Sequence, residues 1–257
     1  MGETTRRDVA HRLGTTTLNG MLVAPTDAAN LPTVLLIHDA FGLGKDMVAI
    51  AEKLAARGLA VFAADVWGDR TTPTEQAEIG PLIRAMVENR SEWQARIVAA
   101  RRAAAEQPES DAANVALLGY CFGGSSALEF LRTGGEARGV IAIHPGLDLL
   151  EHDWSATAAA GVQVHVAVGA VDPMATRKQR RLLEDQLTAA DADWEVDVYS
   201  RTTHAFTSLR SQNSPHPELF DYHPRNAARA WQTTTRVLDE LFPATTGTLP
   251  TEKRRHA

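Results

Sequence analysis

The sequence contains a single cysteine, so the chain cannot form an internal disulfide bond. A small secreted scaffold held together by disulfides is therefore excluded, and a reducing cytoplasm fits best. Long apolar runs are also missing. No stretch approaches the roughly 18 uninterrupted apolar residues that a membrane span needs, and the N-terminus has no apolar core of signal-peptide length. We expect a cytoplasmic protein without a membrane segment.

Positive charge is not in excess either, because 26 lysines and arginines face 32 aspartates and glutamates, for a net charge of -6. A mildly acidic surface repels phosphate backbones and anionic lipids, so nucleic-acid and membrane partners are disfavoured. No pair of residues has the ligand spacing of a zinc site. We predict no metal and no cofactor, and the sequence does not indicate an oligomeric state.

From residue 33 onward, short apolar runs rich in β-branched residues alternate with stretches of helical spacing. Strands are predicted over residues 33–37, 59–62, 114–118, 140–143, 162–168 and 195–199, and helices over 46–57, 74–107 (with a break near Arg90 and Ser91), 122–131, 176–189 and 226–241. This alternation implies an α/β fold with a mostly parallel central sheet and helices on both faces. The segment before residue 30 is expected to add antiparallel edge strands. We expect one domain over residues 1–242 and a polar, flexible tail over residues 243–257.

A buried strand runs into Gly119-Tyr120-Cys121-Phe122-Gly123, and a helix follows at once. This pattern is typical of the nucleophile elbow of α/β-hydrolases, where side chains two residues from the nucleophile would collide with the strand and the helix. The start of the helix offers positive potential and free N–H groups, which favour a thiolate at Cys121. A lone cysteine more often packs in a core, but here the strand, both glycines and the helix favour catalysis.

In this fold an acid and then a histidine follow the nucleophile along the chain. Asp172 and His204 fit that order, and both come after predicted strands, at the edge where α/β sheets build their sites. Either residue alone has an ordinary interpretation as a turn opener or a loop histidine. His38 and His144 follow other strands and are expected to shape the pocket wall, whereas His165 lies inside a strand and is interpreted as packing.

Five segments together resemble the dienelactone hydrolase family (carboxymethylenebutenolidases), from about residue 15 to residue 242. They are Gly119–Gly124, His38–Leu43, Asp65–Gly68, His144–Asp148 and His204–Thr207. The resemblance implies an α/β-hydrolase that cleaves a small ester or lactone through a thioester acyl-enzyme. Cys121 would attack the carbonyl, His204 would shuttle the proton, and Asp172 would orient the imidazole.

The resemblance also assigns the surroundings of the cysteine. The backbone N–H groups of Phe122 and Ala40 would bind the oxyanion. Asp39 stands where the family has a glutamate that is thought to control the ionisation of the cysteine. The aromatic residues expected near the mouth of a partly apolar pocket are Phe41, Trp67, Phe122 and Phe206, although each could instead belong to the core.

One departure from the family leaves the substrate open. The best-known branch grips a substrate carboxylate with two arginines, one of them four residues after the catalytic histidine, and this sequence has Ser208 there. Arg84, Arg90 and Arg210 are candidates to replace it. Two other functions stay open: a binding protein that keeps the fold without turnover, and a thiol sensor that would need an intermolecular partner. It is also open whether residues 70–107 close as a lid.

Overall fold

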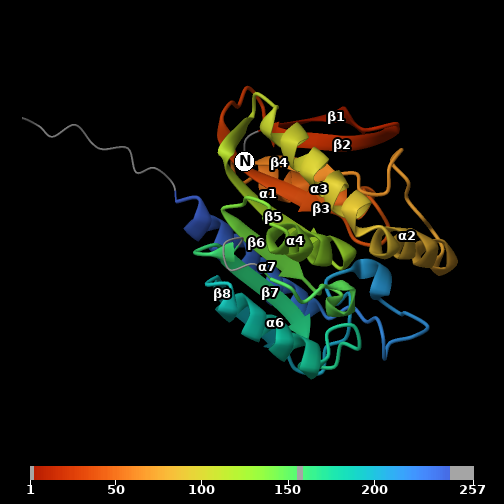
Figure 1. Cartoon of the computed structure of the whole chain (residues 1–257). Helices are drawn as coiled ribbons and strands as arrows, with labels where there is room; N and C mark the ends of the chain where they lie inside the picture. The colour runs from red at the N-terminus through yellow and green to blue at the C-terminus, as the bar shows by residue number, and fades with distance from the viewer. Residues whose placement is uncertain (1–2, 155–158, 244–257) are drawn as a thin grey trace, which may run out of the picture.

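The computed structural model describes residues 3–154 and 159–243, so of the tail predicted over residues 243–257 only Pro243 lies within the described residues. Eight strands form one sheet in the order β1-β2-β4-β3-β5-β6-β7-β8, from top to bottom in Figure 1. The strands are β1 (Thr4–Leu13), β2 (Thr16–Pro25), β3 (Leu31–Ile37), β4 (Ala60–Ala64), β5 (Ser110–Tyr120), β6 (Gly139–Ile143), β7 (Gln163–Gly169) and β8 (Asp193–Tyr199). Among the strands of the described residues, only the pairs β1–β2 and β2–β4 are antiparallel. The mostly parallel sheet with antiparallel edge strands is therefore confirmed.

Helices cover both faces of this sheet, as predicted. They are α1 (Lys45–Ala55), α2 (Gln76–Glu88), α3 (Arg90–Ala105), α4 (Phe122–Arg132), α6 (Arg177–Ala189) and α7 (Pro224–Leu241), with short 3-10 turns η1 (Leu147–Leu149) and η2 (Leu209–Ser211). The predicted break is confirmed between α2 and α3, where the Asn89 side chain accepts a hydrogen bond of 3.2 Å from the N–H of Glu92. Within the ranges 3–154 and 159–243, no helix is both long and apolar enough to cross a membrane.

Two apolar cores hold the layers together. Residues of α3, α4 and α6 pack on one face of the sheet, and residues of α1 and α7 pack on the other. All five residues of β4 and all five of β6 are buried, because both of their faces are covered. That double burial explains why these strands are continuous apolar runs rather than alternating ones.

The carboxyl ends of the parallel strands share one edge of the sheet. Asp39 follows β3, Cys121 follows β5, Asp172 follows β7 and His204 follows β8. Residues up to 165 positions apart along the chain therefore meet at this edge.

The turn that presents Cys121 is strained and tightly packed. Cys121 has a φ of 50° and a ψ of -117°. Residues other than glycine rarely adopt a positive φ. A Cβ atom on Gly119 would overlap the carbonyl oxygen of Gly123, and one on Gly123 would overlap the carbonyl oxygen of Ile37. The two glycines thus allow β5, the start of α4 and the end of β3 to touch through their backbones.

Candidate active site

Cys121, His204 and Asp172 come together at the carboxyl edge of the sheet. Nε2 of His204 lies 3.1 Å from Sγ of Cys121, and Nδ1 of His204 lies 2.8 Å from Oδ2 of Asp172. His204 and Asp172 are 0% and 2% exposed, whereas Cys121 is partly exposed and lines a cavity. The three side chains form a continuous chain of polar contacts that ends on a sulfur within reach of small molecules.

The electrostatics of this chain favour a charged pair. Burial alone lowers the pKa of His204, but the Cys121 thiolate and the Asp172 carboxylate outweigh burial and raise that pKa to about 10. The imidazole is therefore positively charged at neutral pH. A positive charge in contact with a cysteine sulfur favours the thiolate, which is the nucleophilic form of cysteine.

The loop after β7 fixes the Asp172 carboxylate. Its Oδ1 atom accepts a hydrogen bond of 2.8 Å from the N–H of Met174, which leaves Oδ2 for His204. Arg180 of α6 donates to the carbonyl oxygens of Gly169 and Ala175, at 3.3 and 2.5 Å, and so braces both ends of this loop. The acid is therefore oriented by its own loop before any substrate arrives.

The N–H groups expected to bind an oxyanion lie on two different elements, the start of α4 and the loop after β3. The N–H of Phe122 is in the first turn of α4, where a helix has no internal acceptor for it. Ala40 lies in the loop after β3, and its carbonyl oxygen accepts a hydrogen bond of 3.2 Å from Nε1 of Trp67. The Trp67 ring also packs on Phe122, with ring centroids 4.4 Å apart. Trp67 thus contacts both the loop that carries Ala40 and the start of α4 that carries Phe122.

A cavity of about 310 Å³ opens beside Cys121. Asp39 and Phe41 line it as expected, together with His144 and Ser208. Residues that the sequence patterns did not single out supply much of the apolar wall, namely Ile79 and Ile83 of α2, Met174 and Phe220. Figure 1 shows α2 beside the segment that follows β8, at the right of the view. In the sequence, the hydrophobic character of these four wall residues does not distinguish them from core residues.

The expectation that Trp67 and Phe206 line this cavity is wrong. Neither residue is part of the cavity wall, and they are 6% and 0% exposed. Phe206 packs edge-on against His144 and Tyr199, with ring centroids 5.4 and 5.3 Å apart. Phe122, 0% exposed, is buried in the same way. These aromatic rings support the site from the core instead of contacting its contents.

The two histidines expected in the pocket wall have different positions. His144 lines the cavity, and its Nε2 atom lies 2.8 Å from Oγ1 of Thr207. His38 lies beneath the wall: its Nδ1 donates to the carbonyl oxygen of Asp39 at 2.6 Å, and its Nε2 accepts from the N–H of Val66 at 3.0 Å. His38 therefore ties the loop that carries Ala40 and Asp39 to the loop after β4.

Of the arginines considered for a substrate carboxylate, only Arg210 reaches the cavity wall. Its Nε donates to Oδ2 of Asp46 at 2.7 Å, and its guanidinium lies 4.8 Å above the ring of Phe41. Arg84 is exposed on α2, and Arg90 is paired with carboxylates of other segments. Neither of these two lines the cavity.

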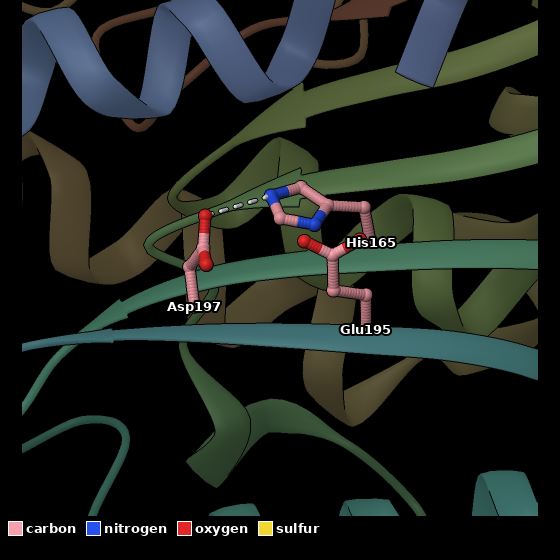
Figure 2. A group of neighbouring side chains, drawn as sticks. All are labelled: His165, Glu195 and Asp197. Carbon is pink, nitrogen blue, oxygen red and sulfur yellow. Dashed lines mark ion pairs between the residues drawn. The ribbon is translucent and has the colours of Figure 1, made fainter. Parts of the chain in front are cut away.

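A second group of polar side chains lies away from the cavity, on β7 and β8. It consists of His165, Glu195 and Asp197, whose nearest ligand atoms all lie within 4.8 Å of one another (Figure 2). His165 is 0% exposed, in line with its predicted place inside a strand. The spacing of residues along the sequence did not suggest this group, because register between two strands brings it together.

The sheet, the strained turn at Cys121 and the His204–Asp172 pair define an α/β-hydrolase. A family model described as "Dienelactone hydrolase family" matches residues 18–242. The chain belongs to this family, which makes it a hydrolase of carboxylic ester bonds. No curated protein sequence matches the chain.

Solved structures agree with this assignment. A dienelactone hydrolase-like promiscuous phosphotriesterase from metagenomic libraries is 30% identical and has a TM-score of 0.86, over 94% of this chain and 100% of that one. A putative dienelactone hydrolase from Klebsiella pneumoniae is 18% identical with a TM-score of 0.70, over 91% of this chain and 98% of that one. This second likeness shows the fold alone.

The buried carboxyl of Asp39 leads to a prediction about pH. Burial raises the pKa of Asp39 to about 6, against the hydrogen bond from Phe41 and the positive charge of Arg210, which lower it. Above about pH 6, the ionised Asp39 carboxylate attracts the His204 imidazolium. Below about pH 6, Asp39 is protonated and this attraction is lost. We expect kcat/KM to fall severalfold as the pH drops through about 6, measured against a neutral ester.

The Asp39→Asn variant should lack this inflection, because an amide does not titrate. Asp221→Asn, at an exposed acid near His204, is the matched control and should keep it. An unchanged inflection in Asp39→Asn would assign the titration to another group.

Proposed function

We propose that the protein hydrolyses small, uncharged esters or lactones, with Cys121 as nucleophile, His204 as proton carrier and Asp172 as the residue that orients His204. The observation that carries this proposal is the contact of 3.1 Å between His204 Nε2 and Cys121 Sγ at the wall of the cavity. At this distance a proton can pass directly between the sulfur and the imidazole. The reaction then needs only a carbonyl carbon brought to the sulfur.

In the first half of the reaction the Cys121 thiolate attacks the carbonyl carbon, and the carbonyl oxygen becomes an oxyanion. The N–H groups of Phe122 and Ala40 donate to that oxyanion, where charge develops in the transition state. The tetrahedral intermediate collapses by breaking the bond to the leaving oxygen. Nε2 of the His204 imidazolium gives its proton to that oxygen, which yields an alcohol and a thioester.

In the second half a water molecule attacks the thioester carbonyl, and neutral His204 takes one of its protons. The second tetrahedral intermediate expels the Cys121 thiolate and releases the acid. Asp172 accepts the hydrogen bond from Nδ1 of His204 throughout, and so stabilises the imidazolium that is present at the start and forms again when water is deprotonated. For a lactone, the alcohol and the acid are the two ends of one product.

The cavity favours an uncharged substrate. Its wall is largely apolar, and the one arginine in it is already paired with Asp46. A carboxylate buried there without a cation of its own would lose its hydration uncompensated. The size of the cavity, about 310 Å³, suits a short acyl group.

Replacing the nucleophile and its base tests the mechanism. Cys121→Ala and His204→Ala should each lower kcat for p-nitrophenyl butyrate by at least about 1,000-fold, since both groups act in the same bond-making steps. His152→Ala, at an exposed histidine outside the site, is the control and should keep wild-type turnover. If Cys121→Ala kept its turnover, another residue would have to be the nucleophile.

The substrate preference gives a separate test. Wild type should hydrolyse p-nitrophenyl butyrate with a kcat/KM at least about tenfold higher than that for the p-nitrophenyl monoester of succinate, which carries a carboxylate. Asp46→Asn removes the ion-pair partner of Arg210 and should narrow this ratio. A wild-type preference for the succinate monoester would contradict an uncharged substrate.

We propose phosphotriester cleavage as a second, slower activity of the same site. The 30% identical relative is described as a promiscuous phosphotriesterase. A neutral triester also develops negative charge on an oxygen during thiolate attack, within reach of the same N–H donors. Paraoxon should release p-nitrophenolate at least about tenfold more slowly than the butyrate ester. This release should stop in Cys121→Ala, and release that persists there would exclude the shared site.

A further inference from the structure

The group formed by His165, Glu195 and Asp197 lies on the side of the sheet that α7 covers, away from Cys121. His165 of β7 is the register partner of Glu195 of β8, and Asp197 comes two residues later on the same face of β8. In Figure 2 the imidazole stands between the two carboxylates, with Nε2 toward Asp197. Nothing in the ester chemistry uses these three residues.

His165 is buried without a hydrogen bond. It is 0% exposed, and neither of its ring nitrogens has a hydrogen-bond partner among the described residues. Buried polar atoms are nearly always paired, with protein, water or an ion. An imidazole with both nitrogens unpaired, aimed at two carboxylates, therefore points to a missing partner.

The distance between two of the ligand atoms is closer to that expected around a metal ion than to that across a bridging water. Nε2 of His165 lies 3.8 Å from Oδ2 of Asp197, beyond the length of a hydrogen bond. A water molecule bonded to both atoms would hold them about 4.5 Å apart. A zinc ion binds nitrogen and oxygen at about 2.0–2.2 Å, so two of its ligands at a tetrahedral angle lie about 3.4 Å apart. The observed gap is within a few tenths of an ångström of that value.

The surrounding charges allow a cation to enter. Arg236 of α7 binds Glu195 at 2.6 Å and also Glu240 at 2.9 Å, so it keeps a carboxylate partner when Glu195 turns toward a metal. The three carboxylates of Glu195, Asp197 and Glu240 outnumber this one arginine. The Glu195 side chain is 49% exposed, which gives it freedom to move and gives the ion a route from solvent.

Hydrogen bonds from two hydroxyl groups already fix the position of the Asp197 carboxylate. Its Oδ2 atom accepts hydrogen bonds from the Tyr199 hydroxyl at 3.0 Å and from Oγ1 of Thr233 at 3.1 Å. Hydroxyl groups that hold a carboxylate in place are usual behind metal ligands. Because Thr233 is on α7, a metal held by Asp197 also joins β7, the edge strand β8 and α7.

We propose that His165, Asp197 and Glu195 bind one Zn²⁺ ion that joins β8 to β7, independently of ester hydrolysis. Imidazole nitrogen with carboxylate oxygen is a donor set that zinc accepts, and water completes four ligands. The ion has a structural role, since no cavity of the active site reaches it.

The test has to exclude binding of zinc by the Cys121–His204 pair, which also offers a sulfur and a nitrogen ligand. Cys121 is first alkylated with iodoacetamide, and the full chain is then titrated with ZnCl₂ by calorimetry. Wild type should bind one equivalent, and Asp197→Asn should bind it at least tenfold more weakly. Asp193→Asn, at an exposed acid on the same strand, is the matched control and should bind as wild type does. Glu195→Gln serves as a second variant if Asp197→Asn does not fold.

X-ray absorption at the zinc edge checks the ligands directly. The alkylated protein with one equivalent of zinc should show nitrogen and oxygen at about 2.0–2.1 Å, with the outer scattering of one imidazole. The proposal would be overturned if wild type bound no zinc. It would also be overturned if Asp197→Asn and Glu195→Gln bound zinc as tightly as wild type does. A zinc spectrum without imidazole scattering would also overturn it.

Discussion

The close backbone contact beneath Cys121 is the constraint on which the rest of the site depends. Gly119 and Gly123 have no side chain, so the end of β5, the first turn of α4 and the end of β3 can meet there. That contact lifts the sulfur above the sheet edge and directs the N–H groups at the start of α4 toward the same space. It also brings the loop after β3, with Ala40 and Asp39, next to the thiol. The strained φ of 50° at Cys121 is tolerated because all three elements are locked by the cores on either side.

A second constraint is electrostatic. A buried imidazole would ordinarily be neutral, and His144 follows that rule, since burial and the nearby positive charge of His204 hold its pKa well below the usual value. His204 is equally buried but carries its charge, because Asp172 and Cys121 both contact it directly. The ring centroids of the two histidines are 5.3 Å apart and both rings are buried, so their different partners account for the difference between their pKa values. Only one of the two is therefore suited to move protons at neutral pH.

Local sequence was enough to predict what depends on short-range geometry. The glycines around Cys121 and the apolar strands of the sheet leave a pattern within a few residues, and the loop positions of Asp172 and His204 follow from strand order. The packing of aromatic rings leaves no such pattern in the sequence. Trp67 and Phe206 are residue types common in pocket walls, but here both are buried behind the wall. The ion pair of Arg210 with Asp46 spans 164 residues, and the His165 group depends on strand register. Pairings of this kind are fixed by the fold, so no spacing rule could find them.

The pairing of Arg210 with Asp46 bears on the substrate that we propose for this chain. The sheet edge positions the groups to which we assign the chemistry, namely the thiol, the imidazole and the N–H groups proposed to bind the oxyanion. The charge that would face the substrate away from its reacting carbonyl is set separately. It depends on whether an arginine in the cavity wall lacks an ion-pair partner. Here the guanidinium lies on Phe41 and is neutralised by Asp46, and Ser208 stands where the resemblance leads one to expect a second arginine. The wall therefore offers apolar surface and an arginine that is already paired, so under the proposed function selection among esters would rest on shape and desolvation and not on a carboxylate clamp.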